Sequence, residues 1–171
     1  MGLLESLVPD SIPLTEEQFK TFLEKTVMSD HARRMAIYHC SIKVISRGKG
    51  KSAVVAAAYR AGEKITNGFD GMTHDYTHEG GVVHTEILLP DHAPAEYADR
   101  AVLWNEVEKI EKARNAQLAR EIEIALPREL TRGQSISLVR EYVKRHFVTA
   151  GMCADFAMHD TGGGTPTPIS C

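Results

Sequence analysis

Long apolar runs are absent from this sequence. None approaches the ~18 residues of a membrane-spanning helix, and no basic segment precedes a short apolar one as in a secretory signal. Cysteine is scarce as well, since Cys40, Cys153 and Cys171 are an odd number at spacings unlike those of metal sites. Together these absences favour a cytoplasmic protein, in a reducing environment, with no membrane span and no disulfide framework.

Excess charge of either sign is also absent, because 20 Lys and Arg face 23 Asp and Glu and the formal net charge is -3. This balance argues against a protein that coats nucleic acid through overall positive charge, as histones do. The cations are unevenly placed, however: residues 43–64 hold six cations and the single acid Glu63. A glycine-spaced basic loop before a helix offers cations and main-chain N–H groups together, as a phosphate backbone requires. We therefore predict DNA binding by Lys43, Arg47, Lys49, Lys51, Arg60 and Lys64.

The chain of 171 residues is long enough for one domain with its own core. Residues 1–34 read as an N-terminal helical extension, in which Thr15 and Gln18 form a capping box for one amphipathic helix. The main domain is expected over residues 35–171. Apolar periodicity predicts strands at 37–46, 82–89, 121–126 and 154–160, and helices at 53–65, 95–120 and 131–147.

Three of the predicted strands carry apolar side chains on one face and ionisable side chains on the other. In 121–126, for example, Ile122 and Ile124 alternate with Glu121 and Glu123. Such strands are typical of an α+β fold with a mainly antiparallel sheet and helices packed on one face only. The open face would then gather His39, Glu121, Glu123 and His159.

Four segments resemble, in order, motifs of the MobA/MobL relaxases, the mobilisation nucleases of plasmids and integrative elements. They are residues 35–41, 52–64, 121–130 and 156–164. The resemblance implies an HUH-type fold with a ferredoxin-like palm and a DNA strand transferase that depends on Mg²⁺ or Mn²⁺. Such an enzyme nicks single-stranded DNA at an origin of transfer and stays attached to the 5′ end through a tyrosine. The implied partners are this DNA, accessory mobilisation proteins and a type IV coupling protein.

The matching motif positions imply roles for individual residues. Tyr59 matches the nucleophile, whose phenolate attacks phosphorus and later leaves, so that the strand can be religated. His159 matches the first of three metal-binding histidines, which hold a cation against the charged transition state. Glu121 and Glu123 match a Glu-x-Glu strand, and one of them is expected to support the metal histidines or to accept the tyrosine proton. His39 matches a family position without an assignable role.

The sequence departs from the family pattern after His159. The other two histidines would fall at positions 167 and 169, where the chain has Thr167 and Ile169. We therefore expect a domain truncated before its His-x-His strand, with an incomplete metal site, a sheet that lacks this strand and little or no nicking activity. Suitable codons for residues 165–171 encode Asn-Pro-His-Ala-His in an adjacent reading frame, so a frameshift is our hypothesis for the change.

Two other functions fit the same residues. One is a rolling-circle replication initiator, which shares the HUH chemistry, although the long helix predicted before Glu121 and the early position of Tyr59 favour the relaxase. The other is a non-catalytic DNA-binding remnant that holds an origin through its basic loop. A further group, His74, His78 and His84, reads as surface histidines, because no fourth ligand follows at a useful spacing.

Overall fold

The computed structural model describes residues 17, 21, 40–126, 130–160 and 167–170. Its main sheet consists of β1 (Cys40–Ser46), β4 (Val82–Leu88), β5 (Gln117–Ile124), β6 (Ala154–His159) and β7 (Thr167–Ser170). The strand order is β1-β5-β7-β6-β4, and every neighbouring pair is antiparallel. The predicted α+β class with a mainly antiparallel sheet is confirmed.

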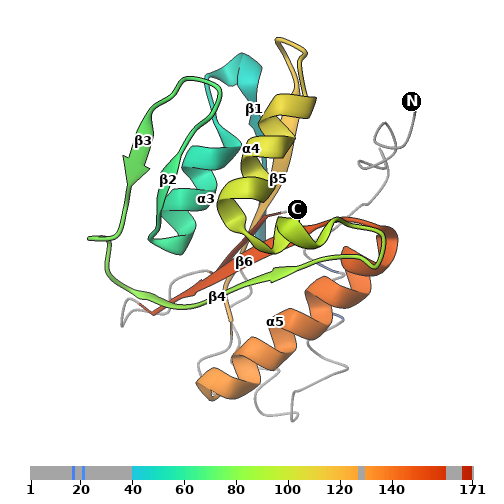
Figure 1. Cartoon of the computed structure of the whole chain (residues 1–171). Coiled ribbons are helices and arrows are strands. Elements are labelled where there is room, and N and C mark those ends of the chain that lie inside the picture. The colour runs from blue at the N-terminus through green and yellow to red at the C-terminus, as the bar shows by residue number, and fades with distance from the viewer. Residues whose placement is uncertain (1–16, 18–20, 22–39, 127–129, 161–166, 171) are drawn as a thin grey trace.

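Three helices pack on this sheet in the described part of the chain: α3 (Ala53–Ala61), α4 (Arg100–Ile110) and α5 (Arg132–His146). Short 3-10 turns lie at Arg47–Lys49, Ala95–Ala98 and Val148–Ala150. A two-stranded ribbon, β2 (Lys64–Thr66) with β3 (Thr73–Asp75), runs beside α3 (Figure 1). No helix among the described residues has the length and apolar character needed to cross a membrane.

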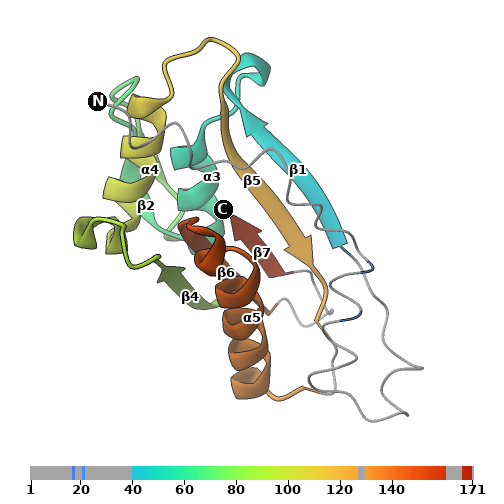
Figure 2. The same ribbon diagram turned by 90° about the vertical axis from the view of Figure 1, so that its right-hand side faces the viewer.

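The helices lie on both faces of the sheet, whereas we expected them on one face only. Helix α5 covers one face, and α3 and α4 cover the other (Figure 1, Figure 2). On the α5 side, Ile122, Ile124 and Phe156 pack against the helix in one core. On the other side, Leu103 and Trp104 of α4 belong to a second core with residues of α3 and β5. The second face accommodates buried ionisable residues because Glu121 pairs with Arg60 of α3 and Asp155 pairs with Arg100 of α4.

Local sequence signals place the helix ends. Ser52 caps α3 by accepting a hydrogen bond from the Val55 N–H, and α3 ends at Gly62, whose φ of 63° is easy only for glycine. Thr131 and Gln134 form a capping box at the start of α5, where a helix was predicted over 131–147. The helix expected over 95–120 is much shorter: α4 ends at Ile110, and the residues from Gln117 onward belong to β5 instead.

The expected loss of the strand near position 167 is wrong. Residues Thr167–Ser170 form β7 in the interior of the sheet, between β5 and β6. Strand pairing uses main-chain N–H and C=O groups, so a strand forms here without the histidines expected in it. The rest of the predicted N-terminal helix, apart from residues 17 and 21, lies outside the described residues, as does His39.

Candidate functional site

Tyr59, the predicted nucleophile, projects into solvent from α3. Its side chain is 56% exposed, and its ring packs edge-to-face on Tyr76 at a centroid distance of 5.3 Å. Helix α3 turns its small residues Ala53, Ala57 and Ala58 to the core, which directs Tyr59 outward. Its hydroxyl makes no hydrogen bond to any residue that the structure describes, so a phosphodiester could reach it without displacing a protein partner.

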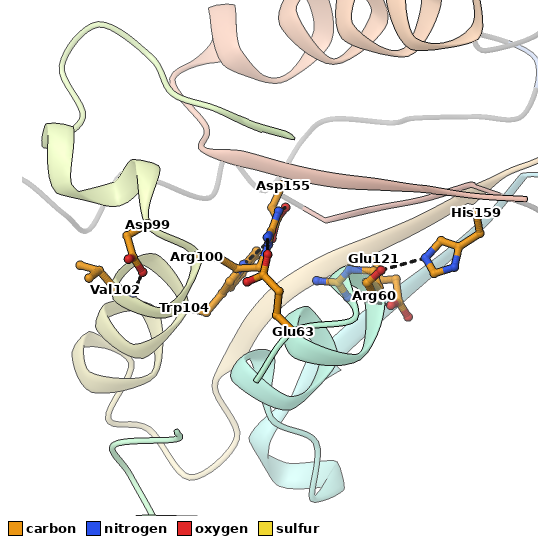
Figure 3. Close-up of polar contacts among 9 residues, drawn as sticks. All are labelled: Arg60, Glu63, Asp99, Arg100, Val102, Trp104, Glu121, Asp155 and His159. Atoms are coloured by element: carbon orange, nitrogen blue, oxygen red, sulfur yellow. Dashed lines mark hydrogen bonds and ion pairs between the residues drawn. The ribbon is translucent and has the colours of Figure 1, made fainter. Parts of the chain in front are cut away.

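His159, the predicted metal ligand, lies at the end of β6 and contacts the helix that carries Tyr59. Its Nε2 is 2.8 Å from the main-chain oxygen of Arg60 (Figure 3). Because a carbonyl oxygen only accepts, Nε2 carries the proton, and Nδ1 of the neutral ring keeps a free lone pair of the kind that binds metals. Since Arg60 follows Tyr59 directly, this hydrogen bond joins the two predicted site residues at the C-terminal end of α3.

Arg60, which we predicted to bind DNA, has its side chain inside the protein. Its side chain is only 4% exposed, and its Nη1 donates a hydrogen bond to Glu121 Oε1 at 2.9 Å (Figure 3). Burial lowers the pKa of Arg60, while the negative charges of Asp155 and Glu121 oppose this shift. The Nη2 group is buried and has no hydrogen-bond partner among the described residues. The cation therefore acts inside the protein, where it neutralises a carboxylate of the sheet.

Glu121 and Glu123 lie on the face of β5 that α3 covers, and each carboxylate forms an ion pair with a cationic side chain. Glu121 pairs with Arg60, whereas Glu123 Oε2 accepts hydrogen bonds from Ser41 Oγ at 3.1 Å and Lys43 Nζ at 2.9 Å. That hydrogen bond and the charge of Glu123 raise the pKa of Lys43. The proposed roles of the two glutamates at the metal or at the tyrosine proton stay predictions.

The remaining predicted DNA-binding cations differ in how free they are. Arg47 is used structurally: its guanidinium donates to the main-chain oxygens of Glu108, at 2.7 Å, and Glu111. Lys64 lies 3.4 Å from Asp75 in an exposed ion pair. Lys49 and Lys51 are exposed and form no ion pair within the described ranges. These last two are the cations of the basic loop best placed to meet a phosphate.

A second buried polar cluster, which the sequence reasoning missed, lies under α4. Asp155 of β6 is 3% exposed and binds Arg100 through two hydrogen bonds, of 2.8 and 2.9 Å (Figure 3). Trp104 Nε1 donates to the same carboxylate at 2.9 Å, and Arg100 also bonds Glu63, which follows α3. An acid four residues before His159, on the same strand face, was the available signal. The cluster ties α4, β6 and the end of α3 together.

The described residues do not form the three-histidine metal site that the family resemblance implies. They contain no group of three or more His, Cys, Asp and Glu side chains placed to hold one ion. The register of the sheet is a second difference from the family motif, which expects histidines at positions 167 and 169. These positions pair with Ile124 and Ile122, which face α5. The positions that pair with Glu123 and Glu121, on the face of His159, are 168 and 170.

Comparison with known proteins gives matches over most of the chain. Residues 51–167 match the sequence model of the MobA/MobL family. The chain is 46% identical over 139 residues to the conjugal transfer protein TraA of Agrobacterium fabrum, covering 75% of this chain and 13% of that protein. It is 50% identical over 125 residues to the mobilization protein MobL of Acidithiobacillus ferridurans, covering 73% and 32%. The chain thus spans less than a third of the length of these two relatives.

A solved structure has a similar fold. It is described as "Molecular Basis of Vancomycin Resistance Transfer in Staphylococcus aureus" and superposes with a TM-score of 0.73. The two sequences are 32% identical, and the match covers 79% of this chain and 69% of that chain. The similarity therefore extends from sequence motifs to the fold of most of the chain.

Proposed function

From the fact that the chain belongs to the MobA/MobL family, we propose that it is the DNA-nicking relaxase domain of a protein of conjugative mobilisation. One observation carries the proposal: the exposed Tyr59 adjoins the residue to which His159 is hydrogen-bonded. The imidazole of His159, from a distant part of the chain, thus contacts the end of α3 that carries Tyr59. Its partners would be single-stranded DNA at an origin of transfer, accessory mobilisation proteins and a coupling protein.

The proposed reaction is an exchange of one phosphodiester for another. The Tyr59 hydroxyl oxygen attacks the phosphorus, a bond forms between them, and the bond from phosphorus to the 3′ oxygen breaks. The phenol proton passes to a base, and the departing 3′ oxygen takes up a proton. The 5′ phosphate stays on Tyr59, and attack by a 3′ hydroxyl in the reverse direction religates the strand. The exposure of Tyr59 and its freedom from hydrogen bonds support this role.

The chain's own residues would act by holding Tyr59 in place. The hydrogen bond from His159 and the buried Arg60–Glu121 pair attach the end of α3 to β6 and β5. Among the described residues His159 is the one imidazole at the site, and these residues do not fit a three-ligand metal centre. We therefore propose that nicking by this chain relies on its own residues and is slow.

The test is the covalent adduct between Tyr59 and DNA. Labelled single-stranded oligonucleotides tiled over the DNA around the gene, with a sulfur in place of the scissile 3′ oxygen, supply a thiolate leaving group that departs readily. We expect a denaturant-resistant adduct with the native chain, none with Tyr59→Phe, and an unchanged amount with the matched control Tyr76→Phe. An adduct that persists in Tyr59→Phe, or no adduct on any oligonucleotide, contradicts the proposal.

A second candidate, a DNA-binding remnant without catalysis, is favoured because the described part of the chain holds no group of three metal ligands. It predicts salt-sensitive binding of single-stranded DNA and no adduct, even with the sulfur-substituted substrate. Replacement of both Lys49 and Lys51 by Gln would then reduce the salt dependence of binding, because two phosphate contacts are removed.

A further inference from the structure

The turn between β2 and β3 holds a large aromatic side chain in water. Phe69 is 71% exposed, although it lies in a well-fixed turn. The buried Asn67 accepts a hydrogen bond from the Phe69 N–H at 2.8 Å, and its main-chain oxygen accepts one from Gly71. Asn105 of α4 accepts a third, from Gly68 at 2.6 Å. Because the main chain of this turn is already fixed, little conformational entropy is lost when a ligand binds to the exposed ring, as is typical of binding surfaces.

A surface cavity of about 570 Å³ lies beside this ring. Residues that line it include Arg47, Thr66, Phe69, Asn105, Lys109 and Lys112. The Arg47 guanidinium lies 5.0 Å from the centroid of the Phe69 ring, in cation–π contact.

The charges of this cavity favour an anionic ligand. Glu108 also borders the cavity, but its buried carboxylate accepts hydrogen bonds from Ser52 and from the Val54 N–H. Lys109 neutralises Glu106 at 2.8 Å. Lys112 is exposed and forms no ion pair within the described ranges, and the basic loop with Lys49 and Lys51 adjoins the cavity through Arg47.

We propose that this cavity is a second contact site for single-stranded DNA. An unpaired base stacks on Phe69, and the neighbouring phosphates of the strand contact Lys112 and the basic loop. The choice of DNA rests on the proposed function, while the stacking surface rests on the geometry. An aromatic ring flanked by cations suits a single strand because every base has a π-face, whereas the bases of a duplex are already stacked. The site reads the strand without requiring a particular base.

The position of the site relative to Tyr59 allows one strand to contact both. The β2–β3 ribbon runs along α3, with Phe69 at its turn and Tyr76, which packs on Tyr59, just after β3 (Figure 1). Ser52, which caps α3 beside the basic loop, lies seven residues before Tyr59, and this separation corresponds to about 10 Å of helix. The DNA strand would thus be held at two places along the ribbon, at Phe69 and at Tyr59, where one of its phosphates would lie.

The experiment measures binding of a labelled, unpaired oligonucleotide of mixed sequence by fluorescence anisotropy. Phe69→Ala should weaken binding about 5- to 100-fold, in keeping with the loss of one stacked base, whereas Phe69→Trp should preserve it. Ile42→Ala, which removes an exposed apolar side chain from β1, is the matched control and should leave the affinity unchanged. Because Phe69 is exposed, its variants should melt at the temperature of the native chain. An oligonucleotide carrying 5-iododeoxyuridine should crosslink to Phe69 itself.

The outcomes separate this inference from the proposed nicking. Equal affinity of native chain and Phe69→Ala overturns DNA as the occupant and leaves the ring to a polypeptide partner, while Tyr59 adducts can still form. Phe69-dependent binding without any adduct supports the second site and contradicts nicking. An absence of all binding overturns both.

Discussion

The imidazole of His159 donates a hydrogen bond from Nε2 to the main-chain oxygen of Arg60, 2.8 Å away and one residue past Tyr59. This oxygen belongs to the last turn of α3, where carbonyls have no partner inside the helix. His159 therefore does two things at once: it satisfies the helix end, and it fixes the direction in which the helix presents Tyr59.

Replacement of His159 should loosen this end of the helix. His159→Ala leaves the carbonyl of Arg60 without its partner, and we expect a loss of about 1–3 kcal/mol in the free energy of unfolding. Urea denaturation measures it. The exposed His78 supplies the control, because His78→Ala should change stability by less than about 0.5 kcal/mol. Equal effects of the two substitutions would show that the hydrogen bond has no structural weight.

The buried pair of Arg60 and Glu121 should be far more sensitive to the loss of one partner than of both. Arg60→Met leaves Glu121 as an uncompensated charge and should destabilise the fold by about 3–5 kcal/mol. The double variant with Glu121→Leu should recover much of this loss, since no charge is left unpaired. Urea midpoints of the single and double variants measure the difference.

The exposed pair of Lys43 and Glu123 is the control for that comparison. Lys43→Met should shift the free energy of unfolding by less than about 1 kcal/mol, because solvent screens the pair. A double variant no more stable than Arg60→Met alone would contradict the view that the buried charge is the cause.

The capping signals and the polar pairs show how far the sequence determines this fold. The cap of α3 and the capping box of α5 depend on residues three positions apart, so both lie within short stretches of sequence in which helices were predicted. The alternation of Ile122 and Ile124 with glutamates likewise predicted a strand with two unlike faces. The helices and strands that are determined by neighbouring residues could thus be predicted from the sequence.

The pairing of distant residues was not. Arg60 and Glu121 are 61 positions apart, and nothing local indicates that the cation turns inward rather than to DNA. Asp155 reads as an exposed acid until Arg100 and Trp104 of α4 are placed against it. Phe69 lies among the turn-forming residues Asn67, Gly68, Asp70 and Gly71, which mark a loop but do not say that its ring is exposed.

The ion pair that joins α5 to the sheet should make stability depend on pH. Arg140 binds Glu86 through two hydrogen bonds, of 2.7 and 2.9 Å, and His84 adds a third. Burial raises the pKa of Glu86, but the hydrogen bonds from Arg140 and His84 and the positive charge of Arg140 outweigh it, and the pKa falls below its ordinary value of 4.5. A lowered folded-state pKa contributes stability above pH 4.5, and this is lost as pH falls through the folded value.

Arg140→Gln should therefore destabilise the protein at pH 7 by about 0.5–1 kcal/mol, and the difference from the native chain should shrink below about pH 4. Urea midpoints at the two pH values test this. The exposed pair of Arg145 and Glu141 on the same helix is the reference, and Arg145→Gln should have a smaller effect at pH 7. A difference for Arg140→Gln that grows in acid would reverse the assigned sign.

The register of β7 predicts where histidines would restore a metal site. Positions 168 and 170 pair with Glu123 and Glu121, on the sheet face that also carries His159, whereas 167 and 169 pair with residues of the α5 core. The double variant Pro168→His with Ser170→His should therefore bind Zn²⁺ through its two new imidazoles and a carboxylate of Glu121 or Glu123, with which these positions pair. The measurement is the melting temperature with Zn²⁺ and with a chelator, which should differ by several degrees when the ion is in large excess over its dissociation constant.

Two further variants decide whether the register is the cause. Thr167→His with Ile169→His, the pair expected from the family motif, should gain no zinc stabilisation and should weaken the core beside Ile122 and Ile124. Glu121→Gln and Glu123→Gln, added together to the 168 and 170 pair, should remove most of the zinc effect, because only two imidazoles remain as ligands. Stabilisation of the 167 and 169 pair alone would mean that β7 pairs one residue out of this register, since a shift by one exchanges the two faces of a strand.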